Sequence, residues 1–367
     1  MLLHRFRYGA HLTKEQVAQL VAPHPDTFEL VGSWLRYNGV PPSSISTTHG
    51  GGWLTVSGMP VSRANELLGA SYQIYYHPGT NETILRTVGY ALPAALHIHV
   101  QTVAPTTAFT SMHRPKPEET LGRPSGGTVN ATSGEPLNML SRRQPNQPNQ
   151  PLPNIYPSFL RWLYRTDAYS PVIPHNGLGI MGHLNEIPYI ADLELFMTKF
   201  RPDITETLSI PDIYEVNRRY GTKLGIHANL DTQYAMALAY PTKVIYYKGT
   251  GRGVQIMSDG TVATGDQYLM WLGYLSRQDY VPQTITLGYG TPETHITEQY
   301  ARALCNLYAQ LGALGTSVLA ASGDAGVGEG ECKDGTGNVR FYTTFPASCM
   351  CRVLFSPHNL YTGRGTT

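Results

Sequence analysis

The chain has 367 residues, with 27 Lys and Arg against 26 Asp and Glu, so its formal net charge is only +1. This balance argues against a nucleic-acid-binding domain, which needs a basic surplus, and against an acidic disordered tail. No stretch approaches the roughly 20 apolar residues of a membrane span, and the start "MLLHRFRYG" has no apolar core of signal-peptide length. The length suffices for two domains, and the many Gly, Pro and Tyr residues favour a loop-rich secreted enzyme over a cytosolic helical protein.

Residues 1–104 are predicted to form a small α+β domain. The stretch "LTKEQVAQLVA" opens with a capping box of Thr13 and Gln16, and "DTFELVGSWLRYNGV" has a helical period that ends at Gly39. Two strand patterns follow, "WLTVSG" and "YQIYYH", with a short helix at 64–68 between them. Helices interleaved with short strands indicate a ferredoxin-like sandwich.

The stretch "LHIHV" alternates in polarity, so a strand there would place His97 and His99 on one face. A metal site is one interpretation, and an ordinary strand end is the other. No third ligand is in view, so we favour the ordinary strand end.

Residues 105–153 are predicted to be a disordered linker. The segments "PKPEETLGRPSGGTVNATSGEP" and "QPNQPNQPLPN" are too polar and too rich in Pro to bury a core. The dibasic pair Arg142 and Arg143 is either a processing site or two solvated arginines. The sequons at Asn81 and Asn130 are candidate glycan sites if the chain is exported.

From residue 154 onward the pattern changes to alternating strands and helices. Apolar strand runs "GLGIMGHL", "KVIYYKG", "TITLGYG" and "TSVLAASGD" alternate with helical runs "ADLELFMTKF", "HANLDTQYAMALAY" and "THITEQYARALCNLYAQLGALG". This alternation predicts a parallel, doubly wound sheet, in which chemistry gathers at the carboxyl ends of the strands. Two segments lie at such ends, 288–290 ("GYG") and 322–324 ("SGD"), as does the helix that follows "KLGI".

His227 and Asp231 are four residues apart on that last helix, so their side chains share one face. An arbitrary pair of this kind is most often a solvated ion pair. Its place at a strand end raises the alternative that it belongs to a site.

All four cysteines lie in the last quarter of the chain, and no Cys-x-x-Cys spacing indicates a metal site. Cys332 and Cys349 could close one disulfide across a Gly-rich loop in an oxidising compartment.

In these segments the sequence resembles the sedolisins, the serine-carboxyl peptidases, and in particular their fungal tripeptidyl-peptidase branch. "YGAHLTKEQV" and "VAPHPDTFELVGSWL" resemble the family's activation prodomain. "PSFLRWLY", "LGIMGHL", "DLELFMTKFRP", "ANLDTQY", "SVLAASGDAGVG" and "FPASC" follow in the family's order, and the likeness runs from residue 8 to 349. The resemblance implies a prodomain at 1–104, a subtilisin-like peptidase domain at 154–349, and an unmatched tail at 350–367.

The resemblance implies a Ser-Glu-Asp triad and an oxyanion-hole aspartate. Asp231 matches the triad aspartate, and His227 stands at the glutamate position. Asp324 matches the oxyanion aspartate, which would be protonated when it stabilises a tetrahedral oxyanion. Gly288-Tyr289-Gly290 matches a Ser-aromatic-Gly segment that binds substrate backbone, although its first residue departs from that pattern.

The family's nucleophile lies in a Gly-Thr-Ser motif beyond "FPASC", but this chain departs from the pattern after Cys349. The "GTS" at 315–317 opens a strand, so we predict that Ser317 is structural and that the nucleophile serine is absent. The resemblance also implies calcium, whose ligands would lie in the part that this chain does not match.

His227 has two interpretations. It could form a His-Asp pair with Asp231 and act as a general base, which would shift activity toward neutral pH because an unperturbed imidazole has a pKa of about 6.5. Alternatively, His227 replaced a glutamate that lost its role together with the serine, and this second interpretation is favoured.

The expected function is therefore that of an extracellular peptidase zymogen of tripeptidyl-peptidase type, inactive as this chain stands. Its partners would be a peptide or protein substrate and its own prodomain as an intramolecular inhibitor, with no nucleic acid and no membrane. One alternative is a non-catalytic homologue that binds or inhibits a related peptidase through its prodomain. Another is an altered reading of a longer gene.

Overall fold

The computed structural model describes most of the first hundred residues and most of the region from 155 to 349. The described residues are 9–48, 50–77, 82–109, 155–169, 176–183, 186–204, 212–215, 223–249, 255–256, 262–263, 267–323, 338, 341, 343–349 and 353–355.

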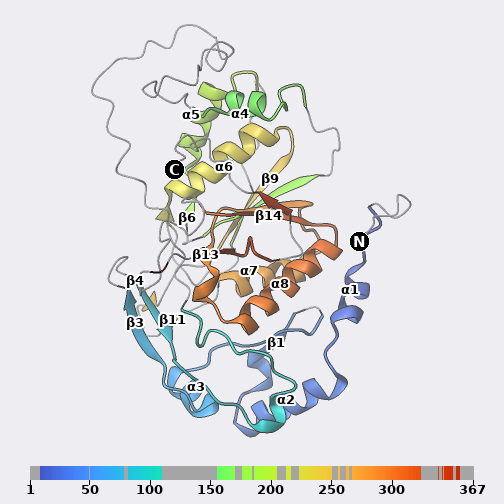
Figure 1. The fold of residues 1–367 in the computed structure, drawn as a ribbon, viewed down its shortest axis with the longest axis vertical. Helices are drawn as coiled ribbons and strands as arrows, with labels where there is room; N and C mark the ends of the chain where they lie inside the picture. The colour runs from blue at the N-terminus through green and yellow to red at the C-terminus, as the bar shows by residue number, and fades with distance from the viewer. Residues whose placement is uncertain are drawn as a thin grey trace.

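In the first region, which spans residues 9–109, the described residues form three helices and two pairs of strands (Figure 1). In chain order they are α1 (Lys14–Val21), α2 (Pro25–Tyr37), β1 (Ile45–Thr47), β2 (Leu54–Val56), α3 (Val61–Leu68), β3 (Gln73–His77) and β4 (Glu82–Arg86), with 3-10 turns at Pro42–Ser44 and Ala94–Leu96. The predicted capping box is confirmed, since the Gln16 N–H donates to Thr13 Oγ1 (3.2 Å) and the Thr13 N–H donates to Gln16 Oε1 (2.9 Å). The region is α+β, as predicted.

The described strands of this region form two separate antiparallel pairs, β1 with β2 and β3 with β4. A ferredoxin-like sandwich needs its strands in a single sheet. The described residues therefore do not show that arrangement.

The predicted strand at "LHIHV" is wrong. Ala94–Leu96 is a 3-10 turn, and the backbone N–H of His99 donates to Leu96 O at 3.0 Å. The turn buries Leu96 against Val31 and Leu35 of α2, a contact that outweighs the alternating pattern.

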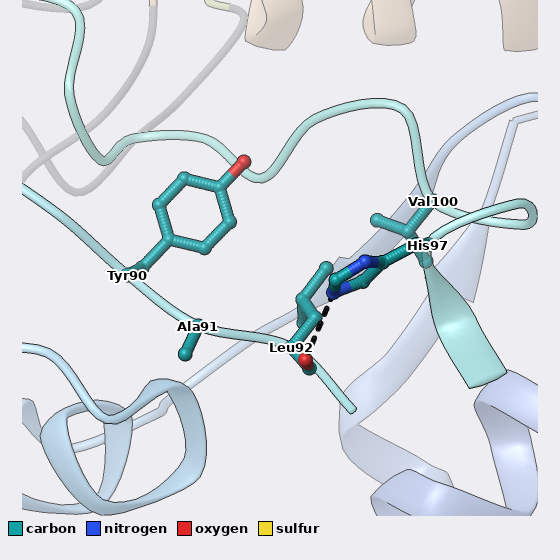
Figure 2. Close-up of a pocket in the computed structure, with 5 residues that line it drawn as sticks. All are labelled: Tyr90, Ala91, Leu92, His97 and Val100. Atoms are coloured by element: carbon teal, nitrogen blue, oxygen red, sulfur yellow. Dashed lines mark hydrogen bonds between the residues drawn. The ribbon is translucent and has the colours of Figure 1, made fainter. Parts of the chain in front are cut away.

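His97 and His99 contact different parts of this region. His99 Nδ1 lies 2.8 Å from Thr27 Oγ1, while His97 Nε2 lies 3.0 Å from the Leu92 carbonyl oxygen. His97 lines an open hollow of about 430 Å³ together with Tyr90, Ala91, Leu92 and Val100 (Figure 2).

Residues 105–109 continue alongside β4, although the sequence assigned them to the linker. Arg86 Nε donates to the Ala108 carbonyl oxygen (2.7 Å), and the Thr87 N–H donates to that of Thr106 (3.2 Å). The other linker residues, with Arg142, Arg143, Asn130 and also Asn81, lie outside the described residues.

The second region alternates strands and helices. Its elements are α4 (Pro157–Leu163), β5 (Gly177–Met181), β6 (Glu186–Ile187), α5 (Ile190–Phe200), β7 (Asp212–Glu215), β8 (Lys223–Leu224), α6 (Ile226–Ala239), β9 (Lys243–Lys248), β10 (Gln255–Ile256), β11 (Val262–Ala263), α7 (Gln267–Arg277), β12 (Thr284–Leu287), β13 (Thr291–Pro292), a 3-10 turn (Glu293–His295), α8 (Glu298–Ala313), β14 (Ser317–Ala321), β15 (Thr344–Phe345) and β16 (Val353–Phe355).

Six of these strands form one sheet in the order β16-β14-β12-β5-β9-β7, and every neighbouring pair is parallel. Helices α5 and α6 cover one face and α7 and α8 the other (Figure 1). Along β9, Val244 and Tyr246 pack toward α5 and α6, while Ile245 and Tyr247 pack toward α7 and α8. The predicted α/β class with a doubly wound parallel sheet is confirmed.

The first region packs against the α7–α8 side of this sheet (Figure 1). The Leu12 N–H donates to the Ala313 carbonyl oxygen at 2.9 Å, Lys14 Nζ donates to that of Gln278, and Trp53 packs against the core. No sheet pairing links the two regions within the described residues. In the part of the chain that the structure describes, no helix is both long enough and apolar enough to cross a membrane.

The predicted pairing of Cys332 with Cys349 is wrong, because Cys349 is bonded to Cys305, with Cα atoms 5.5 Å apart. Pairing of β13 with β15 holds residues 344–349 against the core, where α8 presents Cys305. Cys332 lies outside the described residues.

This disulfide spans 44 residues of sequence, and a crosslink over a loop of that size typically stabilises a fold by about 2–4 kcal/mol. We predict that Cys305→Ser lowers the free energy of unfolding in urea by about this amount. Cys349→Ser should lower it equally, because each substitution removes the same crosslink. Peptide mapping under non-reducing conditions checks the pairing directly. A Cys332–Cys349 crosslinked peptide would contradict the structure.

Candidate active site

Asp231 lies on α6, where that helix passes the carboxyl end of the neighbouring strand β12. Its Oδ1 atom lies 3.3 Å from the position that a Cβ atom on Gly288 would occupy. The carboxyl group therefore rests on the backbone of the 288–290 segment. A side chain at position 288 would intrude on this contact.

Aromatic rings surround this point. The Tyr289 ring is buried, and its centroid lies 5.3 Å from that of His227 and 4.3 Å from that of His183. Tyr268 of α7 lies beyond His183, at 6.4 Å. The structure thus brings together His227, Asp231 and the 288–290 segment, as predicted from their positions at strand ends and at the start of a helix.

A second carboxyl group, that of Glu186 on β6, lies beside the start of α6. Glu186 is only 2% exposed, and its carboxyl group occupies the space beside Gly225 that a side chain there would need. The Tyr246 hydroxyl donates to the backbone oxygen of Glu186 at 3.0 Å. Gly225 is the N-cap residue of α6, so this carboxyl group lies at the amino end of the helix that carries Asp231.

Burial raises the pKa of Asp231 to about 7, and the negative charge of Glu186 adds to the rise. Burial also raises the pKa of Tyr246 well above its ordinary value, with further contributions from Asp231, Tyr289 and Glu186. Asp231 therefore keeps its proton through the acid range. A carboxyl group that exchanges its proton near neutrality can act as a general acid or base.

Glu186 and His183 were not among the site residues predicted from the sequence. His183 follows β5 and so stands at a strand end, a signal that was available but was interpreted only as part of a buried strand. Glu186 offers no comparable signal, because its place beside Gly225 follows from the pairing of β6 with β8.

Ser317 lies at the first residue of β14, as predicted, and so at the amino end of the parallel sheet. Gly315 has a φ of +98° after α8, and the Thr316 hydroxyl donates to the Pro282 carbonyl oxygen at 3.1 Å. These contacts make the Gly-Thr-Ser segment a connection between helix and strand. At about 3.3 Å per residue, β14 separates Ser317 from the carboxyl edge by more than 10 Å.

Two predictions remain, an oxyanion-hole role for Asp324 and a site for calcium. Asp324 lies outside the described residues. Within the described ranges, no group of three His, Cys, Asp or Glu side chains could hold a metal ion. The described residues therefore provide no cluster of acidic side chains for calcium.

Comparisons with known proteins show what this chain is similar to. Residues 4–109 match the family described as Pro-kumamolisin, activation domain. The chain is 32% identical over 359 residues to tripeptidyl-peptidase SED2 of Arthroderma otae, covering 94% of this chain and 57% of that protein. It is 31% identical over 356 residues to a probable tripeptidyl-peptidase SED3 of Trichophyton verrucosum, covering 93% and 56%.

One solved structure, described as Pseudomonas sedolisin (serine-carboxyl proteinase) complexed with two molecules of pseudo-iodotyrostatin, is also similar. It covers 54% of this chain and 52% of its own, with a TM-score of 0.41 and 17% identity, a likeness too weak to support a conclusion. The chain spans a little over half the length of the curated relatives it matches.

The raised pKa of Asp231 predicts how stability changes with pH. Its folded value of about 7 exceeds the ordinary unfolded value, so the native state binds the extra proton between these two pH values. Stability from this group is complete below about pH 4 and is lost as pH rises through 7, by up to roughly 4 kcal/mol. Asp231→Asn should remove that loss.

Urea unfolding from about pH 4 to about pH 8 measures this effect, with exposed Asp167→Asn as the matched control. We expect the wild type and the control to lose stability together, while Asp231→Asn becomes relatively more stable toward pH 8. Parallel profiles for all three proteins would show that Asp231 titrates normally.

Proposed function

Because the chain belongs to the sedolisin family of serine-type peptidases, in its fungal tripeptidyl-peptidase branch, we propose that it carries an activation domain and part of a tripeptidyl-peptidase-like catalytic domain. The two similar fungal proteins carry tripeptidyl-peptidase names, and the match to an activation domain covers residues 4–109. The substrates proposed for this lineage are peptides or proteins, with the first region as intramolecular inhibitor.

One structural observation carries the proposal. Asp231, with a pKa raised to about 7, lies against the 288–290 backbone at the carboxyl edge of a parallel sheet. An extended peptide bound along that segment would place its backbone beside a carboxyl group able to exchange a proton. In this assignment Gly288, Tyr289 and Gly290 bind substrate, and Asp324 stabilises the oxyanion.

His227 is proposed to be a replacement without a catalytic role. An aspartate orients a general-base imidazole when it is ionised. Asp231 keeps its proton up to about pH 7, so such a pair would form only above the acid range. The Tyr289 ring beside His227 gives this histidine a packing role.

We propose that this 367-residue chain does not itself cleave peptides. Serine-type hydrolysis needs an activated hydroxyl within hydrogen-bond reach of its base. The Gly-Thr-Ser segment at 315–317 instead connects α8 to β14, far from Asp231. Binding without hydrolysis, including inhibition of a related peptidase through the first region, is the alternative function that this observation favours.

Export is also proposed. The Cys305–Cys349 disulfide supports an oxidising compartment, in which Asn81 and Asn130 would be available for glycosylation. For calcium, the same proposal assigns an ion to the family, with ligands in a part that this chain does not match.

The proposal predicts no turnover of a tripeptide amide substrate by the purified chain at any value from about pH 3 to about pH 8. Losing the nucleophile of a serine peptidase leaves at most roughly 10³–10⁴-fold catalysis over water. Release of amine from the substrate measures activity, and inhibition of an active relative tests binding in parallel.

Ser317→Ala and Asp231→Ala are the informative variants. Turnover that both substitutions abolish would make Ser317 the nucleophile and overturn the proposal. Turnover unaffected by both would indicate a contaminating peptidase and leave the predicted inactivity standing.

A further inference from the structure

Thr344 lies between two of the segments that form the carboxyl edge of the sheet. The pairing of β12 with β14 extends as far as Leu287 and Ala320. Beyond these residues, β12 continues into the 288–290 segment and β14 leads to Ser322. A ladder of hydrogen bonds keeps neighbouring strands about 4.8 Å apart only along the paired residues. Past the ladder, other contacts must hold the two backbones in place.

Each branch of the Thr344 side chain contacts one of these segments. Its hydroxyl donates to the Ser322 carbonyl oxygen at 3.0 Å. Its methyl carbon, Cγ2, fills the space that a Cβ atom on Gly290 would need, so the methyl group packs directly on the glycine backbone. Thr344 is only 7% exposed, and a β-branched side chain has few rotamers available. One rigid side chain therefore bridges the two strand ends.

The backbone that carries Thr344 is held by three contacts. Thr344 pairs with Pro292 in the antiparallel ladder of β13 and β15. Its carbonyl oxygen accepts from the Ser348 N–H at 2.9 Å, which closes a turn that ends at Cys349. Cys349 is crosslinked to Cys305 of α8. The disulfide thus anchors the turn that carries Thr344 to a helix that covers one face of the sheet.

Phe345, the next residue of β15, extends the link into the aromatic cluster of the site. Its buried ring meets Tyr268 edge to face, with centroids 5.7 Å apart, and Tyr268 lies 6.4 Å from His183. His183 in turn lies 4.3 Å from Tyr289. Strand β15 therefore contacts the 288–290 segment both directly and through the rings that surround its central residue.

We infer that Thr344 is a positioning residue, whose side chain sets the spacing between the 288–290 segment and Ser322, and that the disulfide to α8 holds it there. The proposed function assigns substrate binding to the first of these segments and oxyanion stabilisation to Asp324, which follows two residues after Ser322. The inference deepens that function and rests on it only for the role of the spacing in peptide binding.

Residue-resolved amide hydrogen exchange of the full chain tests the inference with variants that each remove one branch of the side chain. Thr344→Val keeps the methyl group but loses the hydroxyl, so exchange at 322–323 should become roughly 2- to 10-fold faster while exchange at 288–290 stays near the wild-type rate. Thr344→Ser keeps the hydroxyl but loses the methyl group, so it should accelerate exchange at 288–290 alone. Cys349→Ser should accelerate both segments, and wild-type rates in this variant would overturn the role of the disulfide.

Thr343→Val is the matched control, because the exposed Thr343 hydroxyl donates instead to Glu293 Oε2. It should leave both segments unchanged. Equal acceleration of both segments by Thr344→Val and Thr344→Ser, or no acceleration by either, would overturn the inference. If the valine variant does not fold, Thr344→Ser decides alone, since faster exchange at 322–323 or unchanged exchange at 288–290 would overturn it.

Hydrogen exchange requires neither hydrolysis nor a bound peptide, so the two proposals fail separately. Turnover by this chain that depends on Ser317 would overturn the proposed function. Loss of the segment-specific exchange pattern would overturn only the positioning role of Thr344.

Discussion

Parallel pairing of the six strands β16, β14, β12, β5, β9 and β7 brings all their carboxyl ends to one edge of the sheet. This constraint creates the candidate site. The residues that follow β5 and β12 meet at that edge, and α6 passes the same edge on its way to β9. His183, Tyr289 and Asp231 come together although more than 100 residues separate the first from the second. The local backbone contacts then decide how closely their side chains approach.

Two glycines set that approach. Gly288 lets the Asp231 carboxyl rest on the strand end, and Gly225 leaves the space that Glu186 occupies. Glu186 is thereby buried, and Asp231 is half-buried against the strand end. Burial, and after it the charge of Glu186, raises the pKa of Asp231 to about 7. A site of this kind suits chemistry in the acid to neutral range.

The sequence could predict the parts of the fold whose signals are periodic. Runs such as Val244–Lys248 are buried on both faces, so their continuous apolar character alone predicts strands. "LHIHV" failed because burying Leu96 in a local turn outweighed the alternation, and the Cys332–Cys349 pairing failed because tertiary contacts bring Cys305 to Cys349. The place of Glu186 near the site could not be predicted from the sequence, because its carboxyl group fills a space beside Gly225 that exists only in the folded chain.

Infrared difference spectroscopy of the wild type against Asp231→Asn tests the central claim most directly, because a protonated buried carboxylic acid has a carbonyl band that the ionised form lacks. The account predicts that this band is present in the acid range and disappears with a midpoint near pH 7. A band that disappears near pH 4, the ordinary aspartate range, would contradict it.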